Sequence, residues 1–137
     1  MTDKELAGLF VGPHLIGIIF VIAASLQKKW QPKKINSLYG YRTTASMQNQ
    51  QAWDEANRYS ANLMINLGWV LIAIGVITAA GLYFIPTSEE VFAAITLISI
   101  LGSCFASVAV LLTKTERHLE KTFSDKNNIR NNEHQNI

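Results

Sequence analysis

Three stretches of the chain, residues 6–26, 63–85 and 91–112, contain no Asp, Glu, Lys or Arg. A helix of about 20 apolar residues is long enough to cross the hydrocarbon core of a bilayer. Each stretch is apolar on every face rather than along one stripe, which favours a lipid environment over the core of a soluble bundle. The sequence therefore predicts an all-α, polytopic membrane protein with three transmembrane helices.

The first apolar stretch has the flanks of a membrane span. It is preceded by a start of mixed charge, and it is followed by Lys28 and Lys29. A signal peptide begins with a basic region and ends at a small-residue cleavage site, so this order indicates a stop-transfer segment instead. Pro13 lies inside the stretch, and a proline in a helix interior removes a hydrogen bond and bends the axis. We therefore expect one kinked helix here.

Basic residues are concentrated in two of the segments outside the predicted spans. Residues 27–62 carry six Lys and Arg and residues 113–137 carry five, whereas the loop around Pro86 carries none. Lys and Arg mark the cytoplasmic side of membrane proteins. With three spans, the first loop and the tail must share one side, and the charges agree. The sequence predicts an outside N-terminus and a cytoplasmic C-terminus.

Residues 36–62, which we call the cassette, form a polar and aromatic segment before the second span. Thr44 and Ser46 are both suited to cap a helix. We expect a helix from about Met47 that continues into the second span without interruption. Residues 1–124 are then a single membrane domain with a cytoplasmic loop-helix cassette.

The cassette contains charged residues whose pairing the sequence leaves open. Asp54 and Arg58 have the i, i+4 spacing that stabilises a helix, and Glu55 is also within reach of Arg58. Arg42 lies in the loop before this helix. It either pairs with Asp54 or Glu55, or it holds a lipid phosphate or another anionic ligand, because its planar fork of donors suits both.

Polar residues also occur within the predicted spans. Ser99, Ser103 and Ser107 lie on one helix face, and such a small polar stripe lets helices approach and share hydrogen bonds. His14 is a candidate intramembrane polar site, because an ionisable residue inside a span is often functional. The competing interpretations place His14 at the outer interface or on a carbonyl freed by Pro13.

The tail and the titratable residues give no sign of enzymatic chemistry. Residues 125–137 are rich in Asn and lack a core pattern, so we expect them to be disordered. His14, His118 and His134 are far apart in sequence, and Cys104 is the only cysteine. The formal net charge of +2 does not point to nucleic acid. We expect no catalytic residues, no cofactor and no metal site.

The order of residues in the cassette resembles a known family. Gly40-Tyr41-Arg42-Thr43, then Trp53, then Asn57-Arg58 entering a hydrophobic span is similar to the SdpI-type immunity protein family. The resemblance covers about residues 30–85. It implies an integral protein of the bacterial plasma membrane that protects the cell from a secreted, membrane-damaging peptide. The candidate signature or binding residues are Gly40, Tyr41, Arg42, Thr43, Trp53, Asp54, Asn57 and Arg58.

The leading hypothesis is therefore a non-catalytic resistance protein, whose partners are the lipid bilayer and a peptide toxin. It would bind the toxin within the bilayer or occlude the toxin's target. A second hypothesis is a signalling module whose loop and tail recruit a cytoplasmic regulator. A third is a small transporter or lipid-handling protein, which a homo-oligomer would favour because three spans enclose little volume alone.

Overall fold

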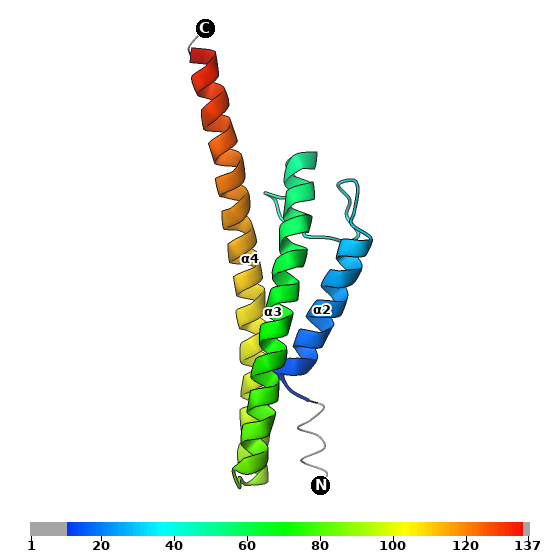
Figure 1. Ribbon diagram of the computed structural model, residues 1–137, viewed down its shortest axis with the longest axis vertical. Coiled ribbons are helices and arrows are strands. Elements are labelled where there is room, and N and C mark those ends of the chain that lie inside the picture. The colour runs from blue at the N-terminus through cyan, green and yellow to red at the C-terminus, as the bar shows by residue number, and fades with distance from the viewer. Residues whose placement is uncertain (1–10, 136–137) are drawn as a thin grey trace.

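The computed structural model describes the backbone of residues 11–135 and the side chains of residues 11–123. This part of the chain folds into three helices, α2 (Pro13–Lys29), α3 (Gln50–Phe84) and α4 (Glu89–Gln135), with no strand among the residues described. A short turn joins α3 to α4 at one end, and a loop leads from α2 back to the start of α3 at the other (Figure 1). The all-α prediction is confirmed.

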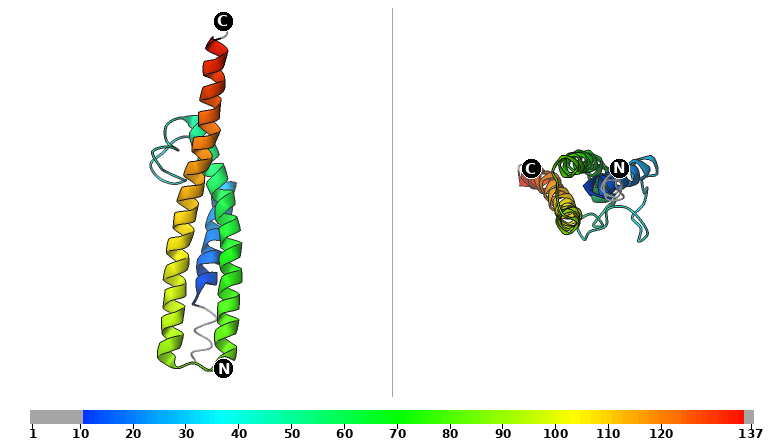
Figure 2. Two further views of the ribbon diagram at one scale, coloured as in Figure 1. Left: turned by 90° about the vertical axis from the view of Figure 1, so that its left-hand side faces the viewer. Right: turned by 90° about the horizontal axis from the view of Figure 1, so that it is seen from below.

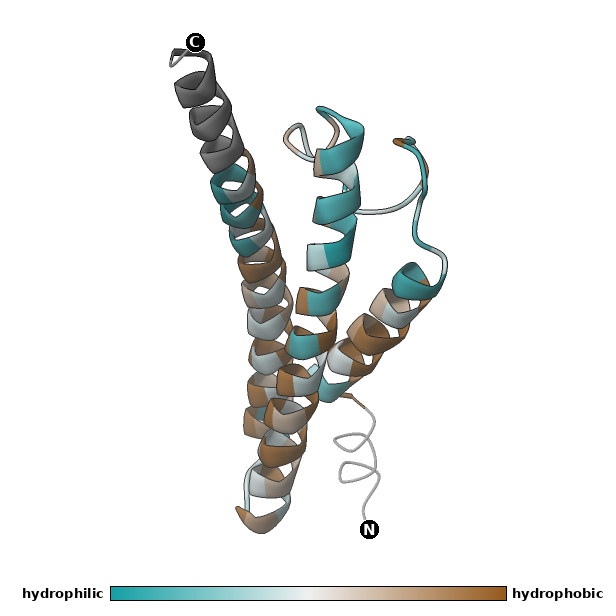
Figure 3. Ribbon diagram, turned by 45° about the horizontal axis from the view of Figure 1, so that its top comes forward, coloured by the Kyte–Doolittle hydropathy of each residue, from teal (hydrophilic) through white to brown (hydrophobic). Residues whose placement is uncertain are grey.

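Two of these helices are long and apolar enough to cross a membrane. They are α3 and the part of α4 from Glu89 to Phe123. Figure 3 shows hydrophobic residues along both helices, and hydrophilic residues at the end of α2 and the start of α3. Helix α2 has 17 residues and coincides with part of the first predicted span, whose residues 6–10 lie outside the description. The described residues thus contain two of the three predicted spans.

Glycines let the backbones of helices α2 and α3 approach each other closely. A Cβ atom on Gly68 would lie 2.8 Å from the carbonyl oxygen of Gly17, and one on Gly75 would meet the backbone of His14. Small residues at membrane helix interfaces allow this close approach, which increases van der Waals contact. Helix α3 packs against both α2 and α4 and lies between them in the view of Figure 1, whereas the side view of Figure 2 shows α2 between α3 and α4, so the three helices do not stand in one row.

The predicted kink at Pro13 is wrong. Pro13 is the first residue of α2, and Gly12 before it has extended backbone angles. The first position of a helix tolerates proline because its N–H group would have no partner inside the helix. A helix start at Pro13 therefore replaces the expected kinked helix.

The start of α3 also differs from the prediction. Helix α3 begins at Gln50, and Asn49 caps it by accepting a hydrogen bond at 2.9 Å from the backbone N–H of Ala52. Asn is among the strongest N-cap residues, which explains the later start. Ser46, a predicted cap, lies in the preceding loop. The predicted continuation of this helix into the second apolar stretch is confirmed.

The serine stripe of α4 faces inward but does not form hydrogen bonds to another helix. Ser107 is buried and Ser99 and Ser103 are half-buried. Their hydroxyls donate to carbonyls one turn earlier in α4 itself, at distances of 2.6 to 2.9 Å. The expected sharing of hydrogen bonds between helices is wrong, because each hydroxyl finds an acceptor in its own helix.

The tail after Phe123 differs from the predicted disorder. The backbone of α4 remains helical as far as Gln135, and this end of α4 extends beyond α2 and α3 (Figure 1). No glycine or proline follows Gly102, so no residue type that breaks helices interrupts α4. The absence of a core pattern therefore does not end the helix.

Candidate functional site

The side chain of Asn57 joins the cassette loop and α2 to α3. Asn57 is 1% exposed. Its Oδ1 atom accepts hydrogen bonds from the backbone N–H of Tyr41 at 2.7 Å and from Nε2 of Gln27, in α2, at 3.2 Å. Its Nδ2 atom donates to the carbonyl of Trp53 at 2.9 Å. One buried carboxamide therefore fixes three segments of the chain.

Gly40 allows the cassette loop to approach the Asn57 carboxamide. Its φ angle is 108°, in the region that side chains with a Cβ atom rarely adopt. A Cβ atom at this position would also lie 2.5 Å from Oδ1 of Asn57 and 3.1 Å from Cγ of Pro32. Glycine is required here because its backbone adopts this φ angle without strain and because there is no space for a Cβ atom.

Trp53 holds the first part of the loop against α3. Its side chain is fully buried, and its Nε1 atom donates to the carbonyl of Pro32 at 2.9 Å. Three residues earlier on α3, Gln50 donates from Nε2 to the carbonyl of Lys33 at 3.0 Å. Because two consecutive carbonyls of the loop are bound to α3, the chain after α2 follows one path.

A tight turn around Ser46 fixes the second part of the loop. The Ser46 hydroxyl is fully buried and lies 3.0 Å from the carbonyl oxygens of both Tyr41 and Thr43. It also accepts from the backbone N–H of Thr43 at 2.8 Å. The Thr43 hydroxyl accepts in turn from the backbone N–H of Ser46 at 3.3 Å. The two side chains satisfy the backbone of the turn between them.

Tyr41 connects the loop to α4. Its hydroxyl donates to Oε1 of Glu116 at 2.9 Å, and its ring packs with Ala56 and Leu119. Burial raises the pKa of the Tyr41 hydroxyl well above its ordinary value, and the Glu116 carboxylate raises it further. Tyr41 therefore keeps its proton and acts as a hydrogen-bond donor to α4.

A second contact between α3 and α4 is made by the Glu55 carboxylate, which also forms an ion pair within α3. Arg58 contacts Oε1 of Glu55 through Nη2 at 2.6 Å and Oε2 through Nε at 3.0 Å. Nε2 of His118 lies 2.6 Å from the same Oε1 atom, and its ring stacks on Tyr59 with centroids 4.0 Å apart. The hydrogen bond from Arg58 is the largest cause that lowers the pKa of Glu55; burial raises this pKa by less, and the hydrogen bond from His118 lowers it further.

Of the two partners open to Arg58, Glu55 is confirmed, whereas the predicted pair of Arg42 with Asp54 or Glu55 is wrong. Arg58 pairs with Glu55 rather than with Asp54, whose carboxylate accepts from Nε2 of Gln50 at 2.7 Å. Arg42 is exposed, and in the described part of the chain no ion pair joins it to either carboxylate. The physical reason is that other partners on α3 and α4 already occupy both acids. A role for Arg42 in binding an anion stays a prediction.

The candidate residues fall into three groups. The structure brings together five of them in a cluster that we call the joint, whereas Arg42, Asp54 and Arg58 are exposed, the first in the loop and the other two on α3. His14 lies at the opposite end of α2, against α3. Sequence analysis missed the long-range partners of the joint, although the Thr43–Ser46 spacing is typical of a side-chain turn. The joint contains Gly40, Tyr41, Thr43, Trp53 and Asn57, and the missed partners are Gln27, Pro32, Ser46, Glu116 and His118.

These residues arrange backbone groups rather than a reacting centre. The buried side chains of the joint donate to or accept from one another and the loop. Among the described residues, no three His, Cys, Asp or Glu side chains are placed to hold a metal ion. The arrangement fixes the loop to α2, α3 and α4.

We expect Asn57→Ala to lower the free energy of unfolding by about 1–3 kcal/mol, because it leaves the buried Tyr41 N–H without its acceptor. Titration with SDS in mixed micelles measures this quantity. Asn66→Ala is the matched control, since Asn66 is exposed on the same helix. Equal stability of the two variants would contradict the role assigned to Asn57.

Comparisons with known proteins agree with the cassette's resemblance and extend it. A family model, that of the SdpI/YfhL protein family, matches residues 33–113, which include most of the loop, α3 and the first half of α4. The uncharacterized protein YfhL of Bacillus subtilis (strain 168) is 48% identical over 69 residues. The aligned region covers 50% of this chain and 63% of that relative, so the chain matches less than two thirds of its length.

No solved structure matches the chain. The family match therefore carries the assignment, and it spans the joint as well as the apolar helices on either side of the α3–α4 turn. Because that match covers more than half of the residues, the protein belongs to the SdpI/YfhL protein family.

Proposed function

We propose that this protein is a non-catalytic protein of the bacterial plasma membrane that protects the cell from a membrane-active peptide. Membership of a family that includes immunity proteins and the two long apolar helices support this proposal. The main observation behind the proposal is that the signature residues form hydrogen bonds within the protein. Their polar groups bind the protein's own loop, which suits a scaffold that holds membrane helices in place.

We further propose three spans, with the N-terminus outside and the C-terminus in the cytoplasm. The loop after α2 and the far end of α4 lie at one end of the molecule, and the α3–α4 turn lies at the other (Figure 1). The first end carries basic residues and the turn carries Glu89 and Glu90. This separation of charge is the one that the distribution of Lys and Arg in membrane proteins favours.

Cysteines introduced at Gln48 and Ser88 test this topology in a Cys104→Ser background. Gln48 lies in the loop and Ser88 in the turn, and both are exposed. A maleimide that cannot cross membranes is expected to label intact cells at Ser88→Cys only, and Gln48→Cys only after permeabilisation. Labelling of Gln48→Cys in intact cells would overturn the orientation.

In the proposed mechanism, the toxin meets apolar side chains of the spans within the bilayer. Large apolar residues point away from the helix contacts, including Ile98 and Phe105 on α4, which are 70% and 75% exposed. The joint keeps the helices that carry these side chains in a fixed arrangement. A peptide that binds this surface, or whose target this surface covers, is kept from damaging the membrane.

Survival in the presence of secreted membrane-active peptides tests the function. At matched abundance in the membrane, Asn57→Ala is expected to reduce survival toward that of a strain that lacks the protein, and Asn66→Ala to leave it unchanged. Removal of residues 125–137 is also expected to leave survival unchanged, because the joint and both long apolar segments precede that region.

The signalling alternative gives the opposite result, since a recruited partner needs accessible sequence at the cytoplasmic end. Loss of protection on truncation, with full protection by Asn57→Ala, would favour recruitment through the tail. Equal survival of the parent strain and the strain that lacks the protein would contradict the protective role itself.

A further inference from the structure

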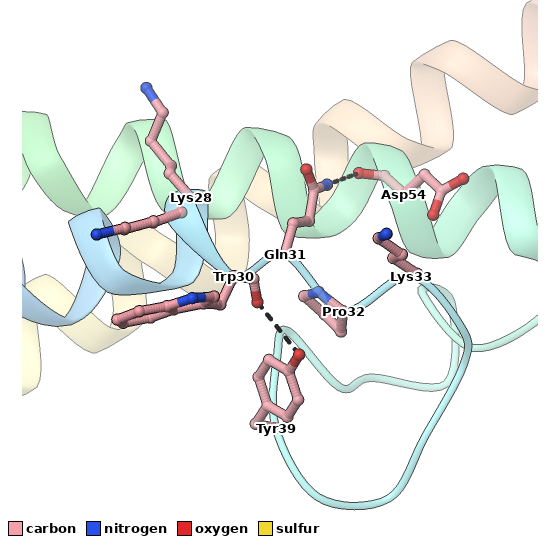
Figure 4. Close-up of a pocket in the computed structure, with 8 residues that line it drawn as sticks. Lys28, Trp30, Gln31, Pro32, Lys33, Tyr39 and Asp54 are labelled. Atoms are coloured by element: carbon pink, nitrogen blue, oxygen red, sulfur yellow. Dashed lines mark hydrogen bonds between the residues drawn. The ribbon is translucent and has the colours of Figure 1, made fainter.

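An open cavity of about 940 Å³ lies where the loop leaves α2. Trp30, Pro32 and Tyr39 form the loop side of this cavity, and Gln31 and Asp54 lie toward α3 (Figure 4). Three lysines, Lys28, Lys29 and Lys33, also line it. The five residues of the joint do not line this cavity.

The cavity has more positive charge than its own groups neutralise. Asp54 is its single carboxylate, against three lysines. In the described part of the chain none of these lysines forms an ion pair, and the Nζ atom of Lys29 lies 5.0 Å from the Trp30 ring centroid. The C-terminus of α2 has a partial negative charge of about half an elementary charge, which offsets less than one lysine.

Hydrogen bonds hold the walls of the cavity in place. The Tyr39 hydroxyl donates to the carbonyl of Trp30 at 3.1 Å, and Nε2 of Gln31 donates to the carbonyl of Asp54 at 3.3 Å (Figure 4). These donors also occupy carbonyl oxygens that would otherwise repel an anion. The three ammonium groups are the cationic groups that this cavity offers to a ligand.

The position of the cavity indicates where the anion comes from. It begins directly after an apolar helix, and Trp30, which is 59% exposed, is of the type that lies at the level of lipid headgroups. Basic pockets beside membrane helices bind the head groups of anionic lipids. Trp30 and Tyr39 offer apolar surface to the part of a lipid that adjoins its phosphate.

We propose that this cavity binds the phosphate group of an anionic phospholipid, such as phosphatidylglycerol, through Lys28, Lys29 and Lys33. A lysine acts as a point charge, so the site selects lipids by charge rather than by headgroup geometry. Asp54 weakens binding and limits the site to ligands that several ammonium groups attract. The bound lipid fixes the end of α2 at the membrane surface.

Native mass spectrometry of the full chain in a neutral detergent tests this proposal, because no charged bilayer surface is present to attract lysines in general. Phosphatidylglycerol is titrated against phosphatidylcholine. Lys28→Gln, Lys29→Gln and Lys33→Gln are combined in one variant, and the control combines Lys34→Gln, Lys114→Gln and Lys121→Gln. The control removes the same charge from exposed lysines outside the cavity.

The parent protein and the control are expected to retain phosphatidylglycerol and not phosphatidylcholine. The cavity variant is expected to bind phosphatidylglycerol roughly a hundredfold more weakly, from about fivefold for each lysine. Asp54→Asn is expected to bind about fivefold more tightly, for the same reason. This gain cannot arise from misfolding, so it keeps the test valid if the triple variant is unstable.

Equal losses in the cavity variant and the control would overturn the site, as would unchanged binding by both Asp54→Asn and the cavity variant. A competition experiment adds inorganic phosphate at millimolar concentration to the protein with bound phosphatidylglycerol. If inorganic phosphate displaces the lipid completely, the cavity is a site for free phosphate and the lipid assignment is wrong. The proposal expects the lipid to stay bound.

Discussion

The buried carboxamide of Asn57 is the interaction on which the rest of the structure depends. It accepts from α2 and from the cassette loop while it donates to its own helix. Leaving a buried donor without its acceptor costs about 1–3 kcal/mol, so each segment is held in the position that satisfies the others. Tyr41, whose N–H group binds Asn57, passes this constraint to α4 through Glu116. One side chain thereby relates three helices and a loop.

The joint and the surface contact between α3 and α4 differ in kind. The hydrogen bonds of Asn57, Trp53 and Ser46 join neutral groups, whereas Glu55 forms an ion pair with Arg58 and also contacts His118. Since its partners lower the pKa of Glu55, this contact stabilises the fold above the ordinary pKa and is lost as pH falls through the lowered one. Arg58 is 59% exposed, so solvent screening keeps the contribution small.

Local rules predicted the helices better than they predicted their ends and contacts. Runs without charge identified the apolar parts of α3 and α4, because burial in lipid excludes charged residues. Pro13 and Asn49 show that a helix start depends on which capping geometry the chain adopts. The signature positions came from a resemblance, and their roles came only with the fold. Glu116 binds a residue 75 positions away, which no periodicity reports. Arg42 was assigned a partner by proximity in sequence, yet the turn at Gly40 sets the path of the loop and leaves Arg42 exposed.

The close contact of Gly40 with Asn57 fixes the loop relative to α4. Double electron–electron resonance between spin labels at Leu38 and Lys121, in a cysteine-free background within lipid nanodiscs, tests it most directly. Both labelled positions are exposed. The parent protein and a Gly102→Ala control, where a Cβ atom meets nothing within 4 Å, are predicted to give one narrow distance distribution. Gly40→Ala is predicted to broaden or shift it. An unchanged narrow distribution in Gly40→Ala would contradict the central claim.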